Sequence, residues 1–328
     1  MAVPAAGGVK VEDALPVRIG VSACLIGAAV RFDGGHKRDD FLTDALGKFV
    51  EFVPICPEVE IGLGVPRPTL RLVRENGETR LLTKDTGVDH TEVMLGFAAR
   101  RAEGLACEDL SGYVLKKDSP SCGMERVRVY GADGLASRTG RGLFARVLLE
   151  RYPNLPVEEE GRLKDFRLRE NFIERVFAYR RLSVFFRSRW TYGGLVAFHT
   201  AHKLQLMAHA PAACSELGAM VAGARTLARE EMRERYENAF MRALRIPATR
   251  ARHVNVLQHA LGYFRDRIGR ASRDELLGLI EDYRHGLVPL VVPITLVRHY
   301  VRLYDIGYLK GQYYLEPHPK ELMLRNHV

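Results

Sequence analysis

Three of the five cysteines stand where the chain could do chemistry. Cys24, Cys56 and Cys122 each follow an apolar segment and lie near a proline or a glycine. Their separations of 32 and 66 residues fit neither a zinc finger nor a CxxC motif, because both of these need closely spaced pairs. An odd number of cysteines in a long chain also argues against a disulfide framework. Metal or redox chemistry is therefore the first hypothesis to test.

Three thiolates without an evident fourth protein ligand favour an iron–sulfur cluster with one open iron, a Lewis-acid site for a substrate. A zinc ion on the same three thiolates, with water in the fourth position, is the chemical alternative. A purely structural reading also remains, since buried cysteines commonly act as small apolar core residues. Cys107 and Cys214 have no comparable setting and are expected to be ordinary free cysteines.

The elements that must position these cysteines alternate along the first half of the chain. Apolar runs predict buried strands, and helical patterns lie between and after them. The predicted strands are 17–21, 49–55 and 112–115, with a possible hairpin edge at 127–130, and the predicted helices are 39–48, 91–103 and 143–152. This alternation predicts an α/β domain with a Rossmann-like parallel sheet. Because ligands bind beyond the carboxyl ends of parallel strands, the three cysteines should converge there.

The pattern changes to helices throughout after the acidic segment 158–161. We therefore expect two domains, residues 15–160 and residues 161–328, and the second should be all-α. A capping box beginning at Ser272 is expected to open one helix, and Gly286 to close it. Asn255 is a candidate cap for another helix. No apolar run approaches the length of a membrane span, and no signal peptide is evident, so a cytoplasmic protein is expected.

Charge divides the chain at the same place. Residues 1–160 carry 21 Lys and Arg against 24 Asp and Glu, a net charge of −3. Residues 161–328 carry 28 against 16, a net charge of +12, and 24 of these 28 basic residues are arginine. Arginine grips phosphate with a planar fork and stacks on bases. The second domain is therefore a candidate nucleic-acid surface, although arginine enrichment on solvated helix faces is an equally plain explanation.

Five motifs in the first domain occur in an order that resembles the thiouracil desulfurase family over about residues 15–160. They are Ser22-Ala23-Cys24-Leu25, Arg31-Phe32-Asp33-Gly34, Cys56-Pro57-Glu58, Pro66-Arg67-Pro68 and Ser119-Pro120-Ser121-Cys122-Gly123. One small departure is Phe32, where the family usually has tyrosine. The remainder resembles a helical YbgA-type domain, through Phe198-His199-Thr200-Ala201-His202-Lys203, residues 255–259 and Gly262-Tyr263-Phe264.

This two-domain arrangement resembles the tRNA 4-thiouridine desulfidases. The resemblance implies a 4Fe–4S cluster held by Cys24, Cys56 and Cys122, with Glu58 as catalytic carboxylate and Ser119 as catalytic hydroxyl. It implies a desulfidase that converts 4-thiouridine in tRNA to uridine and hydrosulfide. A desulfidase of free 2-thiouracil or a related thiobase is the first alternative. A non-catalytic nucleic-acid-binding protein with a structural metal site is the second.

Further residues are candidate contacts, and each has a plainer interpretation. Asp33, Arg67 and Lys116 are candidates for substrate binding; Asp33 could equally form a turn, and the other two could be solvated. Candidates for RNA binding, with Trp190 and Tyr192 beside them, are Arg180, Arg181, Arg187, Arg189 and Lys203. His199, His202 and His209 could share a helix face, but packed histidines are the more common outcome than a metal site.

Overall fold

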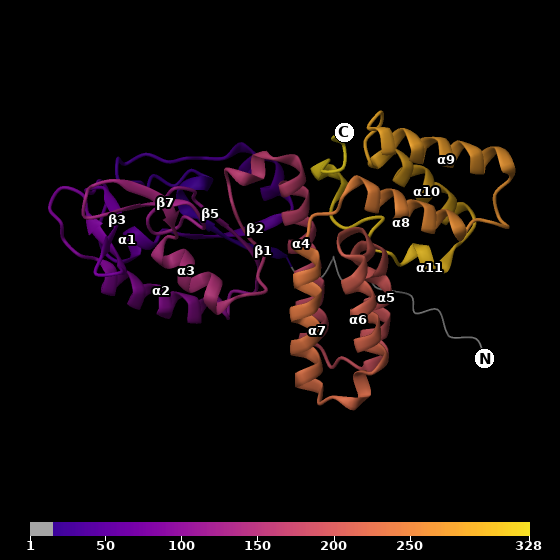
Figure 1. Cartoon of the computed structure of the whole chain (residues 1–328), viewed down its shortest axis with the longest axis horizontal. Helices are drawn as coiled ribbons and strands as arrows, with labels where there is room; N and C mark the ends of the chain where they lie inside the picture. The colour runs from indigo at the N-terminus through magenta and orange to yellow at the C-terminus, as the bar shows by residue number, and fades with distance from the viewer. Residues whose placement is uncertain (1–15) are drawn as a thin grey trace. The chain divides into compact units, whose positions relative to one another are not determined.

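The structure is a computed structural model that describes residues 16–328. The described chain forms two compact units, one ending at Asp165 and one beginning at Phe166. The first unit contains the strands and the second is helical (Figure 1). The predicted fold class, α/β followed by all-α, is confirmed. No helix in the described part of the chain is long and apolar enough to cross a bilayer.

The main sheet of the first unit is entirely parallel and has the order β2-β1-β5-β8. Its strands are β1 (Val17–Ser22), β2 (Val50–Ile55), β5 (Leu110–Leu115) and β8 (Val157–Glu159). Ser22 pairs with Ile55, so β1 and β2 end side by side. All six residues of β5 are buried, as expected for a central strand that has both faces covered.

A second, mixed sheet of order β4-β3-β6-β7 was only partly predicted, as the edge at 127–130. Its strands are β3 (Leu70–Glu75), β4 (Glu78–Thr83), β6 (Val127–Tyr130) and β7 (Ala136–Gly140). Asn76 and Gly77 join β3 to β4 with positive φ angles of 51° and 84°. Asn-Gly between two strands is a strong hairpin signal, because a two-residue turn that matches the strand twist needs positive φ at both positions. The sequence analysis did not use this signal.

The helices of the first unit follow the predictions at 91–103 and 143–152. They are α2 (Thr91–Leu105) and α3 (Leu143–Arg151), which pack against each other (Figure 1), and a short α1 (Pro57–Glu60). The helix expected at 39–48 is wrong in type, because the chain forms a π-helical turn over Phe41–Ala45 and a 3-10 turn over Leu46–Lys48. These turns still bury Leu42 and Leu46.

The second unit contains α4 (Phe166–Arg187), α5 (Tyr192–His209), α6 (Pro211–Ala222), α7 (Arg229–Leu244), α8 (Arg250–Gly262), α9 (Arg270–His285), α10 (Val291–Leu303) and α11 (Gly307–Lys310). Gly286 ends α9 in the left-handed conformation, as predicted. Ser272 and Asn255 are not helix caps: α9 begins before Ser272, and α8 begins at Arg250, after Thr249, whose hydroxyl accepts from the Arg252 N–H. One apolar core lies among α4–α7 and another among α5 and α8–α10.

Candidate active site

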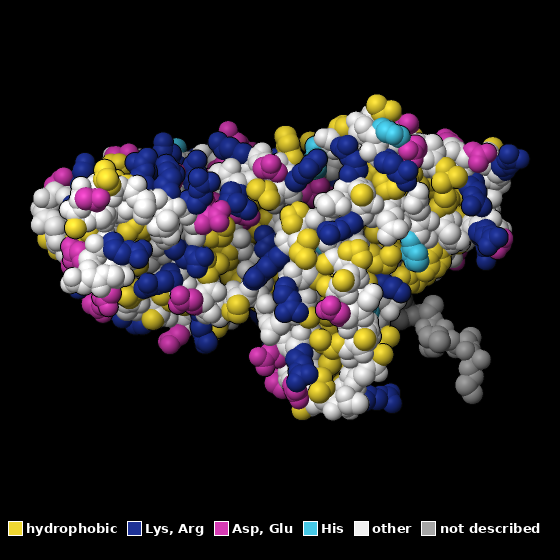
Figure 2. All heavy atoms as spheres, viewed as in Figure 1, with side chains coloured by type: hydrophobic (Ala, Val, Ile, Leu, Met, Phe, Trp, Pro, Cys, Tyr) yellow, Lys and Arg dark blue, Asp and Glu magenta, His cyan; other side chains and the backbone are white. Residues whose placement is uncertain are grey.

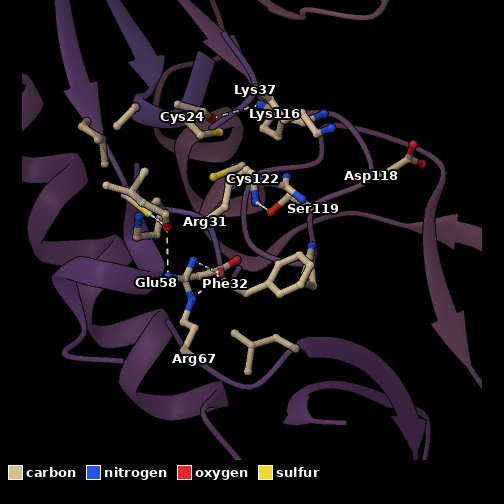
Figure 3. A pocket seen from close by; sticks show the side chains of 18 of the residues that line it. Cys24, Arg31, Phe32, Lys37, Glu58, Arg67, Lys116, Asp118, Ser119 and Cys122 are labelled. Carbon is tan, nitrogen blue, oxygen red and sulfur yellow. Dashed lines mark hydrogen bonds and ion pairs between the residues drawn. The ribbon is translucent and has the colours of Figure 1, made fainter. Parts of the chain in front are cut away.

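The three predicted cysteines line one cavity at the carboxyl ends of neighbouring parallel strands. Cys24 lies in the turn after β1, Cys56 directly follows β2, and Cys122 lies in the loop after β5. The cavity has a volume of about 370 Å³, and Glu58 and Ser119 also line it. Figure 3 shows the side chains of Cys24 and Cys122 directed into the same space. The predicted convergence follows from the strand order, which places β1 between β2 and β5.

The three cysteines are free; Cys24 and Cys122 are buried, and Cys56 is half-buried. Burial raises the pKa of Cys24 to about 11, although the positive charge of Lys116 acts in the opposite direction. Burial also raises the pKa of Cys56 and places that of Cys122 well above its ordinary value. The Cys56 thiol lies 3.8 Å from the Val30 carbonyl oxygen, its hydrogen-bond acceptor. A bound metal would displace these protons, because thiolate rather than thiol is the metal ligand.

The arrangement of the thiols can be compared with the two metal groups considered above. Within residues 16–328, no three His, Cys, Asp or Glu side chains are grouped so that they could hold one metal ion. The three cysteines line one cavity, and an iron–sulfur cluster is held by thiolates that each bind a different iron. Three thiolate donors in one cavity fit an iron–sulfur cluster.

Glu58 is held in place by two neighbours inside the cavity wall. Its Oε2 accepts hydrogen bonds from Nε and Nη2 of Arg67 at 3.0 and 2.6 Å, and its Oε1 accepts one from the Ser121 hydroxyl at 2.9 Å. Figure 3 shows the Glu58 and Arg67 side chains facing each other. A carboxylate offers about four acceptor positions, and these bonds occupy three. The remaining position is available to a water molecule or a substrate proton.

Arg67, a predicted phosphate or base contact, uses most of its hydrogen-bond donors within the protein. Its Nη1 donates to the carbonyl oxygens of Val30 at 2.9 Å and Gly64 at 3.0 Å, while its other donors hold Glu58. Only 4% of its side chain is exposed. Four of the five N–H donors of a guanidinium are therefore used by the protein. Arg67 is therefore not solvated, and its hydrogen bonds position Glu58, while its candidate role as a substrate contact stays a prediction.

Ser119 shapes the turn that carries Cys122. Its hydroxyl oxygen accepts hydrogen bonds from the backbone N–H groups of Ser121 at 3.2 Å and Cys122 at 3.1 Å. The hydroxyl proton is not used in these bonds and can be donated into the cavity. Gly123 completes the turn, because a Cβ there would lie 2.3 Å from the Val127 side chain and 2.8 Å from the Ser119 carbonyl oxygen. The sequence analysis missed Ser121, which joins this turn to Glu58.

Lys116 lines the cavity as predicted, but it is engaged by a partner that the sequence analysis did not identify. Its ammonium group donates to Oε1 of Glu160 at 2.5 Å, and Oε2 of the same carboxylate accepts from the Lys117 N–H at 2.8 Å. Glu160 is buried. This pair anchors the start of the loop after β5, which leads to Ser119 and Cys122.

Asp33 does not line the cavity. Its carboxylate accepts from the Gly35 N–H at 3.0 Å and lies 3.5 Å from Nε of Arg31, so Asp33 forms a turn, the alternative interpretation. The Gly35 N–H bond and the Arg31 charge lower the pKa of Asp33. Its neighbour Phe32 does line the cavity, with 38% of the residue exposed. The departure from the usual tyrosine therefore lies at the cavity mouth.

Two of the five candidate RNA contacts in the helical unit are buried. Arg181 donates to Nε2 of His202 at 3.2 Å and to the Pro317 carbonyl oxygen at 3.1 Å, and Arg180 is also buried. The prediction that Arg180 and Arg181 are surface contacts for RNA is therefore wrong. Trp190 is likewise a core residue rather than an exposed stacking surface. The remaining candidates are exposed: Arg187, Arg189 and Lys203.

The histidines that could have shared a helix face are packed side chains. Nδ1 of His199 lies 3.2 Å from the Tyr236 hydroxyl. His202 is fully buried, and its Nδ1 lies 2.9 Å from the Phe198 carbonyl oxygen. Nε2 of His209 lies 2.8 Å from Oε2 of Glu174. Each therefore has a protein partner, as expected for structural histidines. Cys107 is exposed and Cys214 is buried, and both are free.

Comparison with known proteins places both halves of the chain. The family model described as 2-thiouracil desulfurase matches residues 19–160, and a model described as a protein of unknown function, DUF1722, matches residues 203–319. The chain carries a 2-thiouracil desulfurase domain followed by a YbgA-like domain. The expected family resemblance is thereby confirmed.

Two curated proteins and one solved structure are similar to parts of this chain. The chain is 33% identical over 161 residues to the uncharacterized protein YbgA of Escherichia coli (strain K12), covering 49% of this chain and 95% of that protein. It is 30% identical over 133 residues to the uncharacterized protein YbbK of Bacillus subtilis (strain 168), covering 39% of this chain and 87% of that protein. A solved structure of the [4Fe-4S]-dependent thiouracil desulfidase TudS matches with 34% identity and a TM-score of 0.37, covering 45% of this chain and 94% of the other.

Proposed function

We propose that this protein removes sulfur from 4-thiouridine in tRNA, yielding uridine and hydrosulfide, with a 4Fe–4S cluster bound by Cys24, Cys56 and Cys122. The observation that carries the proposal is the single cavity in which three strand-end thiols meet Glu58 and Ser119. The 2-thiouracil desulfurase domain supports the reaction class, a desulfidase of thiolated nucleobases. The cluster is supported by the donor set and by the cofactor of the similar TudS protein.

The chemistry is hydrolysis of a carbon–sulfur bond. When bound, a cluster with one open iron supplies a soft Lewis acid for the thiocarbonyl sulfur. Glu58 accepts a proton from a water molecule while the water oxygen forms a bond to the thiocarbonyl carbon. The hydroxyl proton of the adduct then passes to the sulfur, the carbon–oxygen double bond forms, and the carbon–sulfur bond breaks, so that the sulfur leaves with its electron pair as hydrosulfide. Water and a thiocarbonyl become a carbonyl, hydrosulfide and the proton held by Glu58, so the reaction needs no external electron donor or acceptor.

The chain's own residues orient this reaction. Arg67 and Ser121 hold the Glu58 carboxylate from two sides, which leaves one acceptor position for the attacking water. The Ser119 hydroxyl has its proton free to donate to the base or to the water. Phe32 at the mouth offers an exposed ring against which a base can stack.

A tRNA substrate is favoured over a free thiobase by charge. The second half of the chain has a net charge of +12, and a free base would need no such surface. Arg187, Arg189 and Lys203 remain exposed in the helical unit and are the candidate phosphate contacts there. A target base inside folded tRNA must leave its stack to reach the cavity, which requires the rest of the RNA to be anchored.

Anoxic reconstitution tests the proposal. The protein is loaded with iron and sulfide, and hydrosulfide release is measured with thiolated tRNA and with free 2-thiouracil. We expect iron and acid-labile sulfide in the 4:4 ratio of one cluster per chain, and turnover of the thiolated tRNA. Turnover of free 2-thiouracil alone would replace the proposal with the free-base alternative. Release from neither substrate by cluster-loaded protein would leave only the non-catalytic nucleic-acid-binding interpretation.

A further inference from the structure

A second cavity of about 290 Å³ adjoins the cysteine cavity, on the small sheet of the same unit. The two cavities are neighbours that share four lining residues: Thr69, Leu70, Asp118 and Pro120. The second cavity is also lined by three basic residues and one aromatic residue, which we name the basic groove: Arg71, Lys84, Arg128 and Tyr130. A substrate that fills the cysteine cavity and extends past these shared residues would enter the basic groove.

The three cations of the basic groove are unneutralised. Within residues 16–328, neither Arg71, Lys84 nor Arg128 forms an ion pair with a carboxylate, whereas Arg80 and Arg138 of the same sheet do. The acidic residue of the groove, Asp118, lies 3.3 Å from Nη1 of Arg138, which offsets its charge. The unit as a whole is slightly acidic, yet Lys and Arg side chains gather on part of its visible surface (Figure 2). The groove thus complements an anionic ligand.

The sheet holds these side chains in place. Leu72 pairs with Val129 and Val73 pairs with Tyr130, so alternation along β3 and β6 places Arg71, Arg128 and Tyr130 on one face. The Arg71 guanidinium lies over the Tyr130 ring, 5.6 Å from its centroid. Nε of Arg71 is buried without a hydrogen-bond partner in the described chain. Because Arg71 has no carboxylate partner and its guanidinium is already positioned by an aromatic ring, the side chain loses little freedom when it binds a phosphate oxygen.

We propose that the basic groove binds the phosphate backbone of the RNA strand next to the nucleotide that enters the cysteine cavity. The inference rests on the proposed function for its substrate class, a thiolated polyribonucleotide. Three separated cations match successive phosphates of a strand, whereas a free base would leave the groove empty. RNA recognition accordingly begins in the catalytic domain itself, in addition to any contact made by the helical domain.

Binding to an unthiolated RNA strand tests the groove independently of turnover. The full-length protein is titrated into a fluorescent single-stranded oligoribonucleotide of about ten nucleotides, at several salt concentrations. We expect the triple variant Arg71→Gln/Lys84→Gln/Arg128→Gln to bind at least about tenfold more weakly. The slope of log affinity against log salt should become shallower by about 2, since each phosphate contact on a single strand contributes about 0.7. The double variant of the two exposed residues, Lys84→Gln/Arg128→Gln, gives the same test with the Arg71–Tyr130 contact intact.

Arg74→Gln is the matched control, because Arg74 is an exposed arginine of the same strand, three residues from Arg71 and therefore on the opposite face. Arg151→Gln, at the end of α3, is a second control. Both should change affinity by less than about twofold. Equal losses in the controls and in the groove variants would overturn the proposal, as would a triple variant with unchanged affinity and salt slope.

Turnover by reconstituted protein separates the strand from smaller ligands. The groove variants should lower kcat/KM for 4-thiouridine within an oligoribonucleotide and leave it unchanged for the nucleoside 4-thiouridine. An equal loss for 4-thiouridine monophosphate would overturn the proposal, since it would indicate a site for a single phosphate. Failure of the proposed function is distinguishable: loaded protein would turn over no thiolated RNA, while the groove variants would still weaken binding of the unthiolated strand.

Discussion

Replacing Arg67 with methionine removes four hydrogen bonds from the wall of the cysteine cavity. Two of them hold Oε2 of Glu58, and two hold the carbonyl oxygens of Val30 and Gly64. Breaking a buried ion pair by removing one partner costs about 3–5 kcal/mol. Glu58 keeps its bond to Ser121, and 15% of its side chain is exposed, so we expect about 3 kcal/mol, the lower end of that range.

The pair is isolated by a double-mutant cycle measured as the free energy of unfolding in urea. Glu58→Gln keeps the shape of the side chain but leaves the buried Arg67 guanidinium without a counter-charge, and it should also cost about 3 kcal/mol. The double variant should lose about 2 kcal/mol less than the sum of the two single losses, because the second change removes the group that the first left unpaired. Additive losses, within about 0.5 kcal/mol, would refute the coupling of these side chains.

Activity tests the positioning role directly. Arg67→Lys keeps the positive charge, but an ammonium group cannot reproduce the fork that places two donors on one carboxylate oxygen. Turnover by reconstituted protein should fall about 100-fold, the loss typical of a catalytic group displaced by about 1 Å, while the visible absorption of the cluster is unchanged. Near-normal turnover by Arg67→Lys would show that Ser121 and the backbone suffice to place Glu58.

Three further predictions follow from the same contacts. Cys24→Ala and Cys122→Ala should each abolish the visible absorption of the reconstituted cluster, whereas Glu58→Gln should retain it and lose turnover; retained absorption in a cysteine variant would remove that residue from the ligand set. Ser119→Ala should lower turnover about 10–100-fold and weaken the turn that carries Cys122. Normal turnover and unchanged cluster content in this variant would show that Ser119 contributes neither to catalysis nor to cluster binding. Burial and the nearby Arg325 lower the pKa of His253 to about 3 in the folded protein. As the pH falls below 6.5, this histidine is therefore protonated in the unfolded chain while it stays neutral in the folded protein. Stability from neutral His253 is therefore present above pH 6.5 and lost towards pH 3, by about 2 kcal/mol at pH 5. Urea unfolding at pH 7 and pH 5 should show a smaller loss in His253→Gln than in the original chain, and identical losses would contradict this assignment.

Local patterns predicted much of the fold. Helices α2 and α3 and the three strands that precede the cysteines lie where the apolar pattern predicted them. The spacing of apolar residues within a single segment is enough to indicate a buried strand or an amphipathic helix. The β3–β4 hairpin was missed although Asn76-Gly77 signals it locally. The turns at 41–48 were taken for an α-helix, since burying residues about four apart satisfies either conformation.

The acidic segment before the helical domain has surroundings that its sequence does not reveal. Glu158, Glu159 and Glu160 resemble a solvated linker in sequence, yet they lie in or next to the buried edge strand β8. Each of the three carboxylates accepts a hydrogen bond. Glu158 accepts from Arg162, four residues further along the chain. Glu159 accepts from the Met124 N–H, and Glu160 accepts from Lys116 and from the Lys117 N–H, and these donors are distant in the sequence. Buried charge is tolerated only where such donors are present, and the sequence does not show them.

The amino-acid sequence by itself determined which residues could be thiol ligands, and the strand–helix alternation was sufficient to bring Cys24, Cys56 and Cys122 to one edge of a parallel sheet. Only the tertiary structure decided what surrounds them. It paired Arg67 with Glu58, directed Ser121 to the same carboxylate, withdrew Arg181 into the helical core and opened the basic groove beside the cavity. These outcomes depend on side chains that meet across strand register and loop crossings, and no periodicity within a single segment encodes such meetings.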